Sequence, residues 1–250
     1  MAFLPRHGIG HEYPPHRVNY RANLWALQSL GVRRIIGPCA VGSLRAEIRP
    51  GDFVVLDQLV DRTSGRPDTY FDGPVVNHVS FADPYCPQLR QLVLGAAGGL
   101  GAVVGPNDQS YNFIRNDVGN CTTDGASPLA GVTVHERGTV VVIQGPRFST
   151  RAESNWYRAA GWEVINMTQY PEAYLARELG MCYCGLALVT DYDTGLDGVD
   201  GIEPVTMHRV LEVLAANVAR TRDLLFAAIP AIADAMACRC QEAGPTGAQA

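Results

Sequence analysis

Residues 186–193 read Leu-Ala-Leu-Val-Thr-Asp-Tyr-Asp, an apolar run that ends in two carboxylates. Continuous apolarity is typical of a strand that is covered on both faces, as in a largely parallel sheet between helices. Asp191 and Asp193 point the same way if the strand continues, and burial at a sheet end would raise the pKa of at least one of them. The run therefore predicts a central strand with an available acid at its end. A solvated acidic loop is the alternative, because Asp197 and Asp200 follow.

Outward from this run, apolar strand-like segments alternate with helical patterns. Helices are expected at 19–30, 89–97, 151–160, 171–179 and from 205 towards 229, and extended segments at 34–36, 53–56, 139–143 and 164–166. Strands that alternate with helices predict an α/β protein with a largely parallel sheet. No repeat or linker divides the chain, so residues 1–237 are expected to form a single domain.

Two stretches depart from this alternation. Residues 98–131 are rich in Gly, Asn, Asp and Ser without a clear period, which predicts a long mobile loop or insertion. The tail at 238–250 is expected to be disordered.

The cationic side chains of this chain are all arginine, because its 20 Lys+Arg include no lysine. A Walker A phosphate loop and Schiff-base catalysis both require lysine and are therefore excluded. Any bound anion must be held by Arg, His, hydroxyl or backbone N–H groups. The net charge of −5 favours neither nucleic acid nor an anionic membrane as a partner.

Other composition features indicate a cytoplasmic protein. The chain opens without a signal-peptide pattern, and its longest apolar stretch, 224–233, is too short to span a bilayer. The seven cysteines include Cys182-Tyr-Cys184 and Cys238-Arg-Cys240 but no CxxC pair, which favours reduced thiols over disulfides or a zinc site. The six histidines show no metal-ligand spacing either, so no metal is expected.

Five short segments at the expected strand ends carry candidate ligand-binding groups: 6–11, 39–44, 145–149, 166–168 and 190–193. Strand ends followed by turns are where α/β sheets present ligands. In the first segment, Arg6 and His7 precede a glycine turn at the end of a short apolar strand and can hold a phosphate or carboxylate. Phe148 can stack on a flat ring, and Thr168 can cap a helix whose N-terminus attracts anions.

Each segment also has an ordinary structural interpretation. The alternatives are surface residues at 6–11, a tight turn at 39–44, a core Phe148 and simple helix capping by Thr168. No single segment decides between the two kinds of interpretation.

Taken together and in order, these segments resemble the trimeric purine nucleoside phosphorylases, in particular the 5′-methylthioadenosine phosphorylase branch. The resemblance covers most of residues 3–193 outside 98–131. The matching blocks are LPRHG (4–8), PPHRVNYRANLWAL (14–27), CAVGSLRAEIRPGD (39–52), DQLVDRT (57–63), FADPYCP (81–87), QGPRFSTRAES (144–154), VINMTQYPEAYLA (164–176) and ALVTDYD (187–193).

The resemblance implies a three-layer sandwich with a mixed, mostly parallel sheet, and phosphorolysis of a nucleoside by inorganic phosphate without another cofactor. It implies a homotrimer acting in purine and methionine salvage. By position, the phosphate would be held by Arg6, His7, Ala40 and Thr168. The sugar and base would contact Met167, Phe148, Ser149 and His11, together with His78 of a neighbouring subunit. The purine edge would face Asp191 and Asp193.

The chemistry of an aspartate at the purine edge favours a 6-amino purine. A protonated carboxyl offers one donor and one acceptor, which matches the 6-amino group and N7 of adenine. A 6-oxo purine shows two acceptors, which an Asn amide serves better. An adenosine-type substrate is therefore expected, with 5′-methylthioadenosine first and a 6-oxo purine nucleoside as the alternative.

One family feature is not found in the sequence. Members begin with a strand and a Gly-Gly-Ser/Thr-Gly loop that contacts phosphate, and by comparison this chain starts about fifty residues late. A start assigned downstream of the true one would explain the difference. A truncated, inactive purine-binding relative is the other hypothesis.

Overall fold

A computed structural model describes residues 1–74, 76–106, 127–199, 202, 206–233 and 238–243. Its central pair of strands is β1 (Arg34–Ser43) and β8 (Cys182–Tyr192), which run parallel along their whole length. The register shifts between Val41 and Gly42, so that Val41 pairs with Val189 but Gly42 pairs with Asp191. This bulge lies where the apolar part of β8 gives way to its acidic end.

The remaining strands are short and extend the sheet on both sides. They are β2 (Phe53–Val55), β3 (Gln58–Arg62), β4 (Val103–Gly105), β5 (Thr133–His135), β6 (Thr139–Ile143) and β7 (Val164–Asn166). The strand order is β3-β6-β7-β1-β8-β2-β5-β4. Only the β1–β7 and β2–β8 pairs are antiparallel among the strands described. The expected mixed, mostly parallel sheet is thus confirmed.

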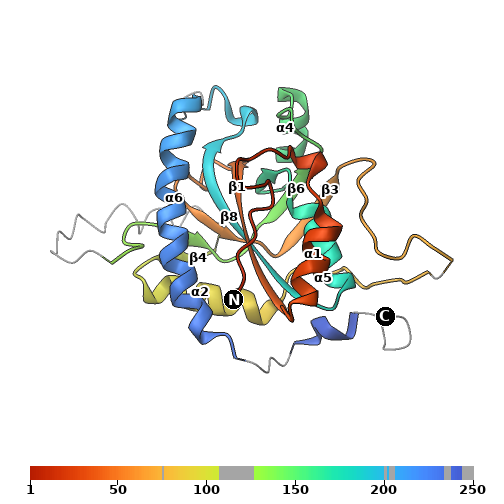
Figure 1. The fold of residues 1–250 in the computed structure, drawn as a ribbon. Helices are drawn as coiled ribbons and strands as arrows, with labels where there is room; N and C mark the ends of the chain where they lie inside the picture. The colour runs from red at the N-terminus through yellow and green to blue at the C-terminus, as the bar shows by residue number, and fades with distance from the viewer. Residues whose placement is uncertain (75, 107–126, 200–201, 203–205, 234–237, 244–250) are drawn as a thin grey trace.

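Helices cover both faces of this sheet and complete three layers (Figure 1). One layer holds α1 (Tyr20–Ser29) and α5 (Gln169–Glu178), and the opposite layer holds α2 (Pro87–Gly99) and α6 (Met207–Ala228). A further helix, α4 (Arg151–Ala159), stands at one end of the sheet. Short 3-10 turns occupy Pro15–Arg17, Thr194–Leu196, Ile229–Ala231 and Arg239–Ala243.

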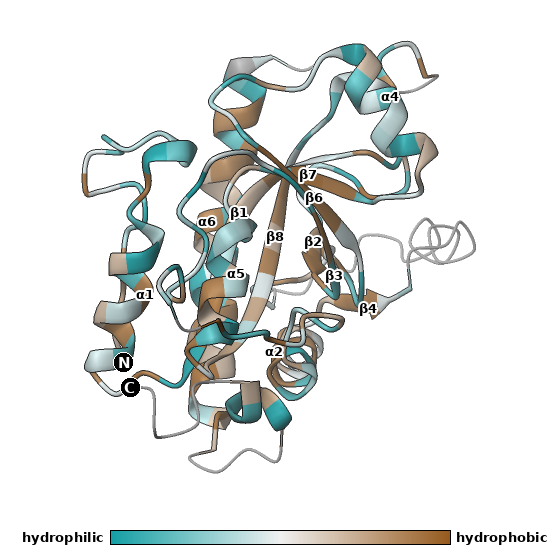
Figure 2. Ribbon diagram, turned by 90° about the vertical axis from the view of Figure 1, so that its right-hand side faces the viewer, coloured by the Kyte–Doolittle hydropathy of each residue, from teal (hydrophilic) through white to brown (hydrophobic). Residues whose placement is uncertain are grey.

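The two-sided burial of β8 explains its unbroken apolar sequence. Ala187 and Val189 pack in the core beneath α1 and α5, whereas Leu186 and Leu188 pack in the core beneath α2 and α6. Figure 2 shows the central strands as largely apolar. Because both faces of the strand are dry, neither can carry polar side chains without a cost in free energy.

The first segment differs from its expected structure. No strand precedes Arg6 in residues 1–5, and Phe3 and Leu4 are exposed, at 70% and 39% of their surface. The chain instead turns at Arg6 and His7, where Gly8 N–H donates to the carbonyl of Pro5. Contacts of the side chains rather than strand pairing fix this segment.

Two other expectations need correction. Within 98–131, α2 continues to Gly99 and β4 follows at Val103–Gly105, so the expected loop does not begin at residue 98. Most of that expectation, at 107–126, lies outside the described residues. The expected disordered tail is also ordered at its start, because Cys240 is buried in a 3-10 turn; residues 244–250 are not among those described.

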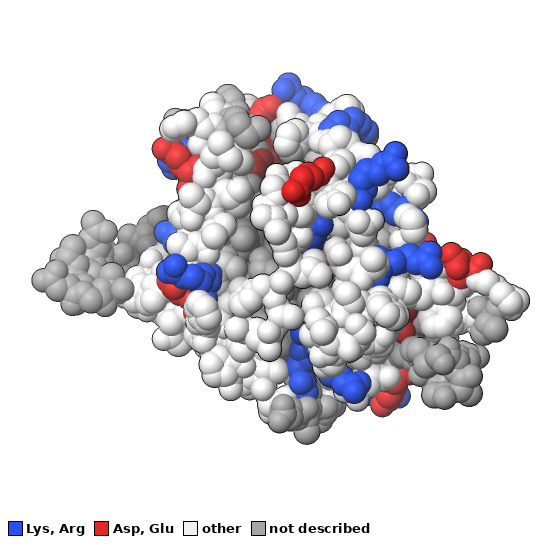
Figure 3. Space-filling view, viewed as in Figure 1, with Lys and Arg blue, Asp and Glu red and all other residues white. Residues whose placement is uncertain are grey.

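Within the described part of the chain, no helix has the length and apolarity needed to cross a bilayer. On the face seen in Figure 3, described acidic and basic side chains are scattered, without an extended basic patch.

Two glycine-to-alanine substitutions should have opposite effects on stability. A Cβ at Gly185 on β8 would lie 2.6 Å from Gln169 Oε1 and 2.8 Å from Tyr85 Cε1, whereas one at Gly95 in α2 would meet nothing within 4 Å. We expect Gly185→Ala to lower the free energy of unfolding by about 1–3 kcal/mol through overpacking. Gly95→Ala should raise it by up to about 1 kcal/mol through helix propensity. Urea denaturation measures both, and equal effects would contradict this view of β8.

Candidate active site

The first cluster of the candidate site joins the N-terminal segment to α5 through a buried ion pair. Arg6 donates from Nε and Nη2 to the two oxygens of Glu172, each at 2.7 Å, and from Nη1 to the carbonyl of Pro38 at 2.8 Å. Tyr183 donates to Glu172 Oε1 at 2.7 Å. Burial pulls the pKa of Glu172 upward, but the charge and hydrogen bonds of Arg6 outweigh it and leave that pKa lowered. The carboxylate is therefore ionised.

Arg6 keeps donors for a further anion beside this pair. A guanidinium has five N–H donors, and three hydrogen bonds account for three of them. Arg6 and Glu172 also line a cavity of about 890 Å³ that includes His7 and His11. Glu172 orients the guanidinium and at the same time offsets its charge, so Arg6 is a directional donor rather than a free cation.

His7 is held by the turn that follows it. Its Nδ1 lies 2.8 Å from the carbonyl oxygen of Tyr13, which can only accept, so Nδ1 carries the proton. Its ring stacks on that of His11 with centroids 4.4 Å apart. Burial lowers the pKa of His7, which keeps the ring neutral and leaves Nε2 as an acceptor.

Asn166, at the end of β7, arranges the next polar group. Its Oδ1 accepts from the backbone N–H groups of Thr168 and Gln169, and its Nδ2 donates to Thr168 Oγ1 at 3.2 Å. The cap of α5 is therefore made by Asn166, and the expected side-chain cap by Thr168 is absent. The hydroxyl hydrogen of Thr168 is left free to donate to a ligand.

Arg66 ties together the two loops that follow β6 and β7. Its five N–H donors match five acceptors: the side chain of Gln144 and the carbonyls of Ile143, Gln144, Met167 and Tyr170, at 2.6–3.3 Å. It also lies over the ring of Tyr20. Met167 was expected to bind a sugar through its backbone, and its carbonyl is already engaged by Arg66.

The acid predicted at the end of β8 is Asp191. Burial raises its pKa to about 6, an effect to which the nearby charge of Asp193 adds and which a hydrogen bond from Thr190 opposes. The carboxyl group lies beside Gly42, where a Cβ would be 3.4 Å from Asp191 Oδ2. Thr190 occupies Oδ1 at 2.6 Å, which leaves Oδ2 as the atom that can carry the proton.

Asp193 has a different environment although it lies only two residues away. Its Oδ1 accepts from Ser149 Oγ at 3.1 Å, and its Oδ2 accepts from the N–H of Gly195. Ser149 in turn contacts Ser154 Oγ at 2.8 Å. Asp193 therefore fixes the strand-to-helix loop that bears Phe148, whose ring is 75% exposed and is not the core residue of the alternative interpretation.

The three remaining candidates lie on the surface. His11 is exposed and adopts a positive φ of 59°. His78 is also exposed and belongs to the connection between β3 and α2, which extends away from the body of the fold in Figure 1. Ala40 is an exposed residue of β1 between the buried Cys39 and Val41.

The structure thus arranges the sequence candidates along β1. Arg6 lies against Pro38 in the middle of β1, and Asp191 lies beside Gly42 near the C-terminal end of the same strand. Between them, Gln169 Nε2 at the start of α5 lies 3.3 Å from Cys39 Sγ. Sequence reasoning did not single out Glu172 or Arg66, and it gave Asn166 no role within the segment 166–168. A carboxylate directly before the run Ala173–Ala176 was the one available signal for Glu172.

Comparisons with known proteins now place the chain. The family described as the phosphorylase superfamily matches residues 1–230, so the chain belongs to that superfamily. It is 50% identical to a purine nucleoside phosphorylase of Streptomyces coelicolor, covering 93% of this chain and 74% of that protein. It is also 50% identical to an S-methyl-5′-thioadenosine phosphorylase of Mycobacterium tuberculosis, covering 96% and 77%.

A solved structure shares the fold. The methylthioadenosine phosphorylase of Schistosoma mansoni, in complex with tubercidin, superposes with a TM-score of 0.75 at 39% identity and covers 91% of this chain and 75% of that one. The single sheet flanked by helices is therefore the nucleoside phosphorylase fold, as the sequence predicted.

Removal of the Glu172 charge should destabilise the fold. Glu172→Gln leaves the half-buried Arg6 without its counter-charge, and breaking such a pair costs about 3 kcal/mol of unfolding free energy at pH 7. Because the pKa of Glu172 is lowered, the wild-type contribution is complete above the ordinary carboxyl pKa and is lost as pH falls through the lowered one.

Urea denaturation at pH 7 and at lower pH measures this difference. The control is Asp72→Asn, which breaks the exposed pair with Arg21 and should cost less than about 1 kcal/mol. Equal losses for the two variants would show that the Arg6–Glu172 pair has no special role.

Proposed function

We propose that this protein catalyses the phosphorolysis of 5′-methylthioadenosine or a closely related adenosine-type nucleoside. The observation that carries the proposal is Asp191, a half-buried carboxyl with a pKa of about 6 at the end of β8, two residues before Asp193, which is hydrogen-bonded to the loop that bears Phe148. The phosphorylase relatives at about 50% identity support the reaction class. The product would be free adenine and the sugar 1-phosphate.

In the proposed reaction, an oxygen of inorganic phosphate bonds to the anomeric carbon while the glycosidic bond to N9 breaks. The bonding electrons pass to the purine, and Asp191 donates its proton to N7. The transition state resembles the oxocarbenium ion of glycoside cleavage, so catalysis consists largely of placing the anion and the acid. Such a general acid typically contributes roughly 10²–10⁴-fold.

The phosphate in this proposal is held by donors that the fold has already oriented. Arg6 has two donors beyond its bonds to Glu172 and Pro38, and Thr168 has its hydroxyl hydrogen. His7 Nε2 accepts from a protonated phosphate oxygen, and the backbone of Ala40 adds an N–H. We propose that phosphate is the sole co-substrate and that no metal or organic cofactor takes part.

Phe148 and Ser149 would contact the base. Met167 would contact the ribose, and His11 would lie near the 5′ end of the sugar. We further propose a cytoplasmic homotrimer in which His78 reaches the site of a neighbouring subunit. The extended connection that carries His78 supports this arrangement, and the free cysteines among the described residues fit a reducing compartment.

A phosphorylase of 6-oxo purine nucleosides is the second candidate, since the Streptomyces relative is named only as a purine nucleoside phosphorylase. The direct test incubates the protein with 5′-methylthioadenosine, adenosine or inosine and measures free base with and without phosphate. Phosphate-dependent adenine release supports the proposal, and hypoxanthine release alone supports the second candidate. Absence of any base would show a purine-binding relative without turnover.

Replacement of Asp191 should change both base preference and pH dependence. Asp191→Asn removes the proton donor and offers an amide N–H to the 6-oxo group, so kcat/KM for the adenosine-type substrate should fall by about 10²–10⁴-fold. The ratio of inosine to adenosine turnover should rise. Asp197→Asn, at an exposed carboxylate paired with Arg151, is the control.

The pH profile tests the same residue independently. Because the acid acts in its protonated form, wild-type kcat/KM at saturating phosphate should fall as pH rises through about 6, the pKa of Asp191. This decrease in kcat/KM with rising pH should be absent from the profile of Asp191→Asn. If the pH profile of the variant were unchanged, a group other than Asp191 would be the proton donor.

Thr168 should act on phosphate rather than on the nucleoside. Thr168→Val removes one hydrogen bond to a charged ligand, about 1.5–3 kcal/mol, and should raise the KM for phosphate by about 10- to 100-fold. Thr168→Ser keeps the hydroxyl and should restore the wild-type value. If only the KM for the nucleoside rose, the phosphate would not bind at the start of α5.

A further inference from the structure

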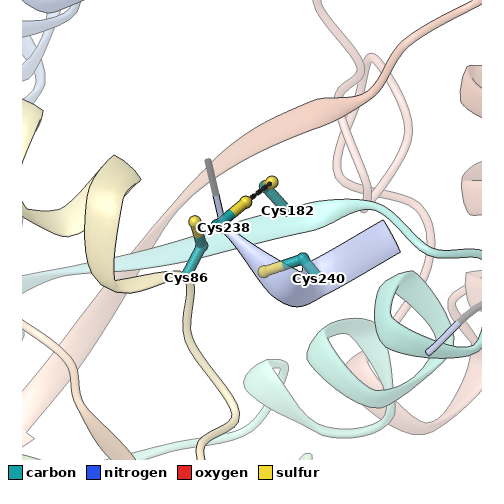
Figure 4. A group of neighbouring side chains, drawn as sticks. All are labelled: Cys86, Cys182, Cys238 and Cys240. Carbon is teal, nitrogen blue, oxygen red and sulfur yellow. Dashed lines mark hydrogen bonds between the residues drawn. The ribbon is translucent and has the colours of Figure 1, made fainter. Parts of the chain in front are cut away.

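Four cysteines that lie far apart in the sequence converge at one end of the sheet, away from the candidate active site. Cys86 precedes α2, Cys182 begins β8, Cys238 directly precedes the C-terminal 3-10 turn, and Cys240 lies in that turn. Their four Sγ atoms all lie within 4.8 Å of one another. Figure 4 shows the four side chains gathered around a common point.

This spacing is close to that of a tetrahedral metal site. Zinc–thiolate bonds of about 2.3 Å in a tetrahedron place neighbouring sulfurs roughly 3.8 Å apart. The Sγ atoms of Cys182 and Cys238 are 3.3 Å apart, well beyond the ~2.05 Å of a disulfide. Small side-chain adjustments would therefore bring all four sulfurs to bonding distance of one ion.

The surroundings suit a thiophilic ion. Cys86, Cys182 and Cys240 are buried and Cys238 is half-buried, so the cluster is enclosed by the apolar residues of α2, β8 and α6. Cys86 is also the N-cap of the 13-residue α2, where the helix dipole stabilises a thiolate.

We propose that Cys86, Cys182, Cys238 and Cys240 form a structural tetrathiolate site for one divalent thiophilic metal ion, zinc in the first place. All four positions of the ion would be filled by protein sulfur, so the site is closed and has no place for substrate. The ion joins the starts of α2 and β8 to the C-terminal turn. It is independent of the phosphorolysis proposed above.

Metal binding to the purified full-length chain tests this site. The protein is reduced, stripped with a chelator and titrated with Zn²⁺ or Co²⁺. We expect one ion per chain, release of thiol protons on binding, and the visible bands and thiolate charge-transfer absorption of tetrahedral Co²⁺. Zinc should also raise Tm, because it binds the folded state.

Two matched variants locate the site. Cys238→Ser changes the least buried ligand and should abolish the cobalt–thiolate spectrum and the zinc-dependent rise in Tm. Cys184→Ser changes a buried cysteine two residues from Cys182 that is not part of the cluster, and should leave stoichiometry at one ion per chain. Circular dichroism confirms that each variant is folded.

Three results would overturn the proposal. The first is an absence of stoichiometric binding to the reduced wild-type chain. The second is an equal cobalt spectrum in wild type and Cys238→Ser. The third is a native mass lower by two or four hydrogens without metal, which would show that the cluster closes as disulfides.

Discussion

The parallel pairing of β1 with β8 is the constraint on which the rest of the structure depends. These two strands separate the hydrophobic core beneath α1 and α5 from the one beneath α2 and α6. Their bulge at Gly42 shifts the register by one residue, and a shift of one residue turns a side chain to the other face of a sheet. Asp191 thereby comes to lie beside Gly42, where burial governs its ionisation.

The absence of lysine gives the candidate site a particular electrostatic character. Arg6 is the cation nearest to the proposed phosphate, and its charge is matched by Glu172 before any ligand arrives. An anion would therefore be held mainly by the number and direction of the hydrogen-bond donors around it, and less by net positive charge. Arginine suits this role, because its planar fork can serve a carboxylate on one edge and a second anion elsewhere.

Much of the fold could be predicted because its signals are local. The apolar run of β8 and the helical period of α4 identify these elements from consecutive residues, and the Asp pair marks a strand end. The strands β3, β4 and β5 were not expected: β3 is polar at three of its five residues, and β4 and β5 lie within or just after the Gly-rich stretch 98–131. Their structure depends on neighbours in the sheet rather than on their own sequence.

The candidate site was less predictable, because its geometry comes from distant pairs. Arg66 sits in a turn-like sequence, and nothing near it indicates contacts with carbonyls about 80–100 residues away. Asp191 and Asp193 are equivalent as a sequence pattern, and their different environments come from the bulge and from their hydrogen bonds with Thr190, Ser149 and Gly195. The four cysteines likewise have no recognised metal-binding spacing, although the fold gathers them.

The five hydrogen bonds of Arg66 bear on how a ligand would bind. Loops that are free in solution lose conformational entropy when they close on a ligand, and this loss weakens affinity. Here one guanidinium holds the chain after β6 and the chain after β7 in place by five hydrogen bonds. These two loops are thus preorganised during folding, and association need not be slowed by their rearrangement.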